Sequence, residues 1–297
     1  MPRFLRSGTG AVGSVLLVLV VAVALVGPFL APHPVDRPVG IPYTGSSAEA
    51  VLGTDFLGRD VLSRTLWGGR SVIALAGLAV LLAYAGGLAV GLAAGYSRGL
   101  LDPILMRTAD VLLSLPALLF LLVLVTGLGS SRGVLVLGVA VIQLPLIARI
   151  IRSATQAQSV RGFVEAAAAR GERTSAILVR ELLPNVAPTI AADIGLRLTY
   201  AIILVASVNF LGLGLQPPDA DWGLMVSENR SGLNLNPLAV LAPATFIALL
   251  TIAVNMVGDA VARAQGVSAL EVGARTWGEA PGSPTSLPPA PESGVVP

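Results

Sequence analysis

Few side chains in this chain have the types and spacing that covalent or metal chemistry requires. The 297 residues include no cysteine and one histidine. His33 stands between two prolines, which is typical of a solvated loop residue and not of a metal ligand. No G-x-x-x-x-G-K-[ST] sequence is present, so the chain should not bind a nucleoside triphosphate itself. We expect no catalytic residue, no metal site and no cofactor bound by this chain.

Two pairs of opposite charges lie inside apolar stretches. Arg107 and Asp110 are three residues apart, and Asp193 and Arg197 are four apart, so each pair would share one helix face. Such pairs could form an ion relay or could tie together the inner end of a helix bundle. No acidic path continues across the bilayer, which favours the tie. The pattern also argues against an intramembrane protease and a proton-coupled carrier.

A polar island at residues 155–188 separates two apolar stretches. Ser159 could cap a helix that runs through Glu165 and the alanines after it. Gly171 permits the left-handed turn that would end this helix.

A second short helix would follow the bend. Thr174 or Ser175 could cap it, Pro184 would stop it, and Pro188 would stand before the next apolar span. Two short helices joined by a glycine could lie on anionic lipid or could dock a partner. Physical chemistry alone ranks these two interpretations equally.

The elements that must position these residues are membrane spans. The chain is 54% apolar and 12% charged, with mean hydropathy +0.81, whereas soluble domains carry about 25% charged residues. A membrane helix needs about 20 mostly apolar residues. The segments that qualify are 11–31, 71–96, 104–128, 133–151, 189–213 and 237–261. We therefore predict an all-α membrane protein with six transmembrane helices.

The first span and the loop arginines set the expected orientation. The apolar run after Arg3 and Arg6 is longer than a typical signal-peptide core and lacks an A-x-A-like site, which favours an uncleaved anchor. Arginines are more frequent in alternate loops, which places the polar island and both termini in the cytoplasm. Asp259 is expected near the interface. In the second span, closely spaced glycines indicate tight helix packing. They are Gly77, Gly86, Gly87, Gly91 and Gly95.

The polar island resembles the EAA loop of ABC-importer permeases. The matching residues are Glu165, Ala166, Ala167, Gly171, Ile177, Leu183 and Pro184, followed by Asn185. The island stands before the penultimate span, as that loop does. Glu181 departs from the pattern, because the family usually has histidine there. It could pair with Arg180, Arg173 or a partner residue.

Further motifs are similar to those of dipeptide, oligopeptide and nickel permeases, of the second permease subunit type. Residues 52–64 resemble the outer-loop signature, residues 210–223 resemble the segment after span five, and a Ser114-Leu115-Pro116 turn also fits. The outer-loop motif residues are Gly53, Asp55, Gly58, Arg59, Asp60 and Arg64.

The resemblance implies a type I ABC-importer fold in the plasma (inner) membrane of a prokaryote. It implies a heterodimer with a second permease subunit, two ATPase subunits that bind ATP and Mg, and an extracytoplasmic substrate-binding protein. Membrane lipid is the remaining partner, and no nucleic acid is expected. The EAA loop would be a coupling helix in an ATPase groove, with its shape held by hydrogen bonds to Glu165. Tyr200 and Asn209 would line the path.

The resemblance implies import of short peptides, with nickel and glutathione-like substrates as alternatives. The expected organisation is an anchor span with an extracytoplasmic loop (1–70), a five-span permease domain (71–265) containing the coupling loop (155–188), and a disordered Pro-rich tail (266–297).

Overall fold

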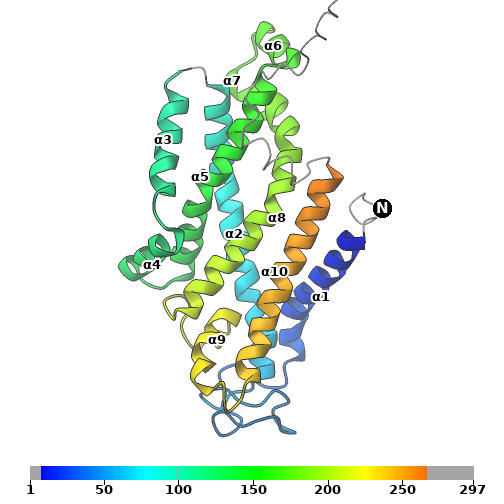
Figure 1. Cartoon of the computed structure of the whole chain (residues 1–297), viewed down its shortest axis with the longest axis vertical. Helices are drawn as coiled ribbons and strands as arrows, with labels where there is room; N and C mark the ends of the chain where they lie inside the picture. The colour runs from blue at the N-terminus through cyan, green and yellow to red at the C-terminus, as the bar shows by residue number, and fades with distance from the viewer. Residues whose placement is uncertain (1–7, 98, 266–297) are drawn as a thin grey trace, which may run out of the picture.

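The computed structural model describes residues 8–97 and 99–265, which form a helical bundle (Figure 1). Arg3, Arg6, Arg98 and the expected Pro-rich tail lie outside the described residues. The long helices are α1 Gly8–Leu30, α2 Val61–Tyr96, α3 Leu101–Leu113, α4 Ala117–Leu128, α5 Arg132–Ser159, α8 Leu183–Phe210 and α10 Leu238–Ala264. The short ones are α6 Gly162–Ala169, α7 Thr174–Ala176, the π-helix η2 Ile177–Leu182, α9 Trp222–Asn229 and the 3₁₀ turn η3 Arg230–Gly232.

The expected all-α architecture is confirmed. In the described part of the chain the only extended pairings are two isolated β-bridges in the loop before α2. Five helical runs are long and apolar enough to cross a membrane, with α7, η2 and α8 forming one run, Thr174–Phe210. The bent pair α3 and α4 makes a sixth span if it is counted as one.

The third span is sharply broken. The axes of α3 and α4 differ by 82° at Ser114–Pro116, and Figure 1 shows α4 lying across the long axis of the bundle. Pro116 cannot donate a backbone hydrogen bond, and its ring disfavours a helical conformation at Leu115. The chain therefore turns at Ser114-Leu115-Pro116 as expected, but the change of direction is much larger than that of a kinked helix.

The second span begins earlier than its hydropathy indicates. The Asp60 carboxylate caps α2 by accepting hydrogen bonds from the backbone N–H groups of Leu62 and Ser63. The helix therefore starts at Val61, and the expected domain border at residue 70 falls inside it. The first turn of this helix contains a charged residue and is buried by the outer loop. Its hydropathy is therefore low, and a hydropathy window does not detect the start of the helix.

Helices α2 and α5 pack closely along most of their length. A Cβ placed on Gly87 would meet Ile147, and one on Gly91 would meet Ile151 and the Ala148 carbonyl. Gly86 and Gly95 face α5 in the same way, whereas Gly77 has open space beside it. The close-packing interpretation is thus confirmed for every glycine in the set except Gly77.

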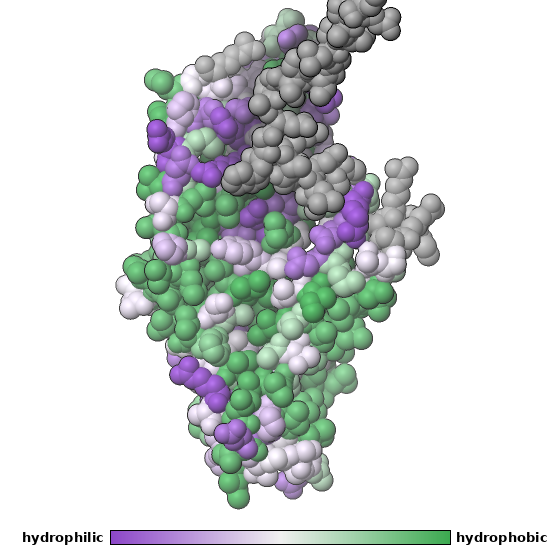
Figure 2. Space-filling view, viewed as in Figure 1, coloured by the Kyte–Doolittle hydropathy of each residue, from purple (hydrophilic) through white to green (hydrophobic). Residues whose placement is uncertain are grey.

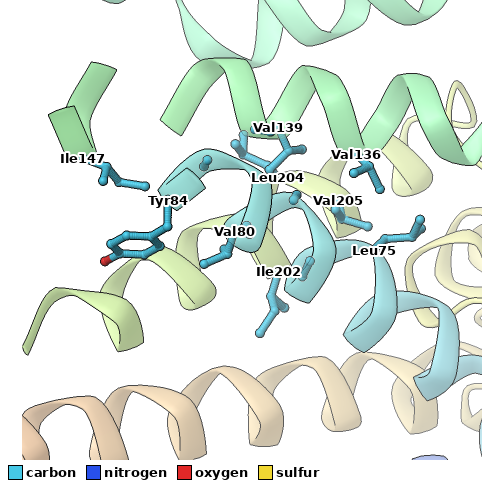
Figure 3. Packing of buried hydrophobic residues seen from close by; sticks show 14 of the residues in the cluster. Leu75, Val80, Tyr84, Val136, Val139, Ile147, Ile202, Leu204 and Val205 are labelled. Carbon is cyan, nitrogen blue, oxygen red and sulfur yellow. The ribbon is translucent and has the colours of Figure 1, made fainter. Parts of the chain in front are cut away.

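The core lies where α2, α5 and α8 meet. Figure 3 shows buried side chains of all three helices in this region, among them Val80 of α2, Val139 of α5 and Val205 of α8. Apolar side chains are also exposed on the outside of the bundle, and Figure 2 shows a broad hydrophobic region across the middle of the face in view. Exposed residues such as Val15, with 67% of its surface accessible, fit a lipid-facing surface.

Both ends of the chain's helical part lie at one end of the bundle. The Arg263 guanidinium near the end of α10 donates a hydrogen bond to the Thr9 hydroxyl near the start of α1. Figure 1 shows α6 and α7 at this same end, and the loop before α2 together with α9 at the other. We call these the α6 end and the α9 end.

Candidate functional site

The polar island folds into a bend that projects at the α6 end. We call residues 161–185 the bend element. The Gly171 N–H donates to the Ala168 carbonyl, and the Glu172 N–H donates to the Ala167 carbonyl, which is the Schellman pattern of a helix end. Gly171 has φ +74° with open space around it. Its role is therefore conformational, and the left-handed turn expected there is present.

The bend element divides the EAA-like residues into two groups. Ala167 and Ile177 are buried and hold α6 against η2, and Leu183 is half-buried. Glu165, Ala166, Gly171 and Pro184 are exposed. The exposed group can contact a partner directly, while Ala167 and Ile177 set the shape of the element.

In the isolated chain Glu165 does not hold the shape of the bend element, contrary to expectation. Within the part of the chain that the structure describes, its exposed carboxylate accepts no hydrogen bond. The backbone bonds around Gly171 hold the bend instead. Glu165 is thus an exposed carboxylate free to meet another molecule.

Pro184 does not stop a helix as expected, and Pro188 lies inside the next span and not before it. One continuous run passes through both, because η2 widens the helix just before Pro184 and the Leu183 N–H donates to the Leu178 carbonyl. A π-turn changes the backbone pairing where proline lacks an N–H. The bend element is therefore directly continuous with α8.

The expected side-chain caps of the two short helices are also absent. The N-cap of α6 is Arg161 and that of α7 is Arg173, neither with a side-chain cap bond. Ser159 ends α5, where its hydroxyl donates to the Gln156 carbonyl. Thr174 and Ser175 lie inside α7. The chain enters each helix in an extended conformation that does not use these hydroxyls.

Glu181 pairs across the bend with a residue that sequence reasoning did not choose. Its carboxylate lies 3.7 Å from the Arg170 guanidinium, which also contacts Glu172 at 2.6 Å. Neither Arg173 nor Arg180 is its partner. Those two arginines instead line an open groove of about 530 Å³ beside the bend.

The outer-loop motif forms a buried ionic network at the α9 end. Asp55 accepts hydrogen bonds from the Arg59 backbone N–H at 2.8 Å and from its Nε at 2.6 Å. Arg59 and Arg64 both donate to Glu228 of α9, at 3.2 and 2.9 Å. We call Asp55, Arg59, Arg64 and Glu228 the outer network. Burial raises the pKa of Glu228, and the two arginines oppose this shift.

The other outer-motif residues shape the loop around the outer network. Asp60 caps α2, and His33 lies 3.5 Å from its carboxylate. Gly53 and Gly58 both have positive φ, at +74° and +76°. The pattern of this motif could be read in the sequence, but its partner Glu228 could not, because nothing local to α9 shows that two arginines from a distant loop reach it.

Asn209 is not a path-lining residue in this structure. It is fully buried, its amide nitrogen donates to Asp221, and its amide oxygen accepts from the Leu215 N–H. Asp221 caps α9 and accepts a hydrogen bond from the Ser71 hydroxyl at 2.6 Å. Burial raises the pKa of Asp221, and these hydrogen bonds oppose the shift. Asn209 thus fixes α9 to the end of α8.

Tyr200 lines a cavity of about 330 Å³ at the break between α3 and α4. Leu112 of α3, Phe120 of α4 and Ile142 of α5 form other parts of its wall. The Tyr200 side chain is partly exposed. Both helices of the broken span, α3 and α4, thus line this cavity together with α5 and α8.

Of the two expected intrahelical charge pairs, the one between Asp193 and Arg197 is present. The prediction of the other, between Arg107 and Asp110, is wrong. Arg197 donates to Asp193 at 3.0 Å, and the Tyr84 hydroxyl also donates to Asp193, at 2.8 Å. Asp110, however, pairs with Arg149 of α5 and not with Arg107. Asp102 makes a second bond of this kind to Arg152, at 2.6 Å. For Asp110, a neighbouring helix thus supplies a better-placed partner than its own helix does.

Comparison with known proteins identifies the family. A family model described as "binding-protein-dependent transport system inner membrane component" matches residues 87–266. This chain belongs to that family of transport permeases. A second model, the "N-terminal TM domain of oligopeptide transport permease C", matches residues 1–44. The permease is therefore an ABC-importer subunit of the dipeptide, oligopeptide and nickel type.

Individual relatives agree with this assignment. The permease is 34% identical to the glutathione transport system permease protein GsiD of Pectobacterium atrosepticum, over 86% of each chain. It is 33% identical to GsiD of Escherichia coli, again over 86% of each. A chain of the MetNI methionine ABC transporter, in an inward-facing crystal structure, has the same fold. It matches with TM-score 0.55 and 18% identity over 69% of this permease and 96% of that chain.

Proposed function

We propose that the permease forms half of an ATP-driven import path for short peptides, with glutathione-like peptides among them. The relatives named as glutathione permeases support this substrate class. Nickel is less favoured, because no group of three or more His, Cys, Asp or Glu residues that could hold a metal occurs in the described part of the chain.

The bend element would couple ATP-driven motion to the spans. The single observation that carries this proposal is the exposed surface of Glu165, Ala166 and Gly171 on a bend that runs without a break into α8. Because the helix from Thr174 to Phe210 is continuous, a displacement of the bend would move α8 with it. ATP closure can bias the spans only if the docked element moves in this way.

The remaining parts of the transporter would be separate chains. Two ATPase subunits would bind ATP and Mg and hydrolyse ATP, and a second permease subunit would complete the path. An extracytoplasmic binding protein would deliver the peptide to the α9 end, where the outer network makes the loop rigid. The α6 end, with both termini of the chain, would face the cytoplasm of the cell.

A charge reversal at Glu165 tests the coupling role. We expect Glu165→Arg, expressed with the permease's own ATPase and partner subunits, to lose ATPase co-purification and uptake. The reversed side chain is exposed and has no bonded partner within the described residues, so the fold should persist. Glu49→Arg, the same change at an exposed site in the loop before α2, is the matched control. Normal ATPase co-purification with Glu165→Arg would refute the coupling role.

A further inference from the structure

The side chains that line the cavity at the broken span are almost all apolar. Aliphatic and aromatic side chains such as Leu112, Phe120 and Leu146 form its wall, and the Tyr200 hydroxyl is the only polar side-chain group among the lining residues. A short peptide carries several amide groups. Moving an amide from water to apolar surroundings without a hydrogen-bond partner is unfavourable. This wall as it stands is poorly suited to a peptide.

A buried polar side chain without a hydrogen-bond partner adjoins one of these lining residues in the chain. Gln143 of α5 is fully buried, and neither atom of its amide has a hydrogen-bond partner. Its chain neighbour Ile142 lines the cavity. Its amide offers two donor hydrogens and one acceptor oxygen. Leaving such a buried group unpaired is unfavourable, so leucine would be more favourable at this position in the packing seen here.

Helix α8 also has a buried polar side chain without a hydrogen-bond partner, next in the chain to a residue that lines the cavity. The Thr199 hydroxyl of α8 is buried and unpaired, and its chain neighbour Tyr200 lines the same cavity. The other buried side chains with an unpaired polar atom in the described ranges lie elsewhere in sequence and do not line the cavity. They are His33, Arg64, Thr65, Thr155 and Glu228.

A rotation of α5 about its axis would turn the Gln143 side chain toward the cavity. Consecutive helix residues are separated by about 100°. Gln143 precedes Leu146, which lines the wall, by three residues, so the two side chains are about 60° apart around the axis. Part of this angle can be covered by the flexible glutamine side chain. Pro145 lies between them and removes one backbone hydrogen bond of α5, which makes the helix easier to bend here.

We propose that Gln143, together with Thr199, enters the translocation path when the spans change their packing and forms hydrogen bonds with the amide groups of the passing peptide. This inference rests on the proposed import of peptides. The glutamine amide can donate to a peptide carbonyl and accept from a peptide N–H. In the packing seen here both groups are withdrawn, which leaves the path apolar and releases the solute.

Transport assays on matched variants test this role. Gln143→Leu should import a labelled tripeptide about tenfold more slowly in proteoliposomes that contain the complete transporter. Its melting temperature should be equal to or above that of the wild type. Gln143→Asn should retain part of the uptake. The controls are Gln156→Leu, at an exposed glutamine of the same helix, and Thr251→Val for Thr199→Val, because the Thr251 hydroxyl bonds to its own helix.

Thiol labelling gives an independent readout in a chain that has no cysteine. Gln143→Cys should resist a water-soluble thiol reagent in the nucleotide-free transporter and react when ATP is trapped with vanadate. Wild-type uptake by Gln143→Leu, or no labelling in either state, would overturn the inference. If the wild-type transporter imports no peptide, the proposed function fails, and labelling alone then decides whether Gln143 enters the path.

Discussion

At the scale of single residues, the permease separates side chains that present a surface from those that shape it. Glu165 and Ala166 are exposed on the bend element, while Ala167 and Ile177 are buried behind them. Gly171 touches nothing that a methyl group would displace. Its value lies in its backbone conformation, which can be tested without altering any contact.

Gly171→Ala isolates that backbone contribution. A left-handed conformation costs an alanine about 1 kcal/mol, so we expect the bend to loosen and the uptake rate to fall severalfold while the melting temperature of the bundle stays the same. Gly162→Ala is the matched control, because Gly162 also has open space around it but no positive φ. Equal uptake by the two variants would show that the turn at Gly171 is not required.

The outer network predicts a pH dependence. Burial raises the pKa of Glu228 from its usual 4.5, so the folded protein keeps a proton that the unfolded chain has already released. The stability contributed by this group is complete below the unfolded value and is lost as the pH rises through the folded value. The melting temperature of the wild type should therefore fall relative to Glu228→Gln as the pH rises above about 4.5, the ordinary value for this carboxyl.

The control for this titration is Ser227→Ala on the same helix, which removes no titratable group. Its melting curve should follow that of the wild type at a constant offset across the whole pH range. A constant offset for Glu228→Gln as well would contradict the raised pKa.

At the scale of elements, ion pairs between helices position the broken span. Asp102 and Asp110 of α3 reach Arg152 and Arg149 of α5. These pairs fix α3 beside α5 on one side of the break at Ser114–Pro116, and α4 then turns across the bundle. The cavity lined by Tyr200 lies at this break, so its shape depends on both pairs.

A double-mutant cycle distinguishes the pairing partner of Asp110. Both side chains of the Asp110–Arg149 pair are about half exposed, so their coupling should be about 0.5 kcal/mol. The variants are Asp110→Asn and Arg149→Gln, singly and combined, with the free energy of unfolding measured in detergent. The corresponding cycle with Arg107→Gln should give no coupling. Coupling to Arg107 alone would support the intrahelical pair instead.

The sequence predicts elements with strong local signals and misses those set by distant neighbours. The spans, the turn at Gly171 and the close packing of Gly87 and Gly91 follow from hydropathy, backbone conformation and side-chain size. The passage of a helix through Pro184 does not, because a π-turn depends on how η2 packs against the rest of the bundle. The partners of Asp110 and Glu228 likewise belong to segments far away in the chain.

At the scale of the whole molecule, the permease has a rigid end and a projecting end joined by continuous helices. The α9 end is fixed by the outer network and by Trp222, whose indole N–H donates to the Thr65 carbonyl at 2.8 Å. The α6 end carries the bend element, which is held to the chain by buried side chains, namely Val164, Ala167, Ile177 and Leu182, and presents Glu165 and Ala166 to solvent. A force applied at the α6 end would therefore be transmitted along α8 toward the cavity.

The most direct test of this account is a cross-link between the bend element and an ATPase subunit. Because the chain has no cysteine, Ala166→Cys places a single reactive group at the exposed surface, and Ala48→Cys places one in the exposed loop at the α9 end. In membranes that contain the complete transporter, a bifunctional thiol-to-amine reagent should join Ala166→Cys, but not Ala48→Cys, to an ATPase subunit. The account would be contradicted if Ala166→Cys formed no ATPase adduct while the transporter remained assembled and active.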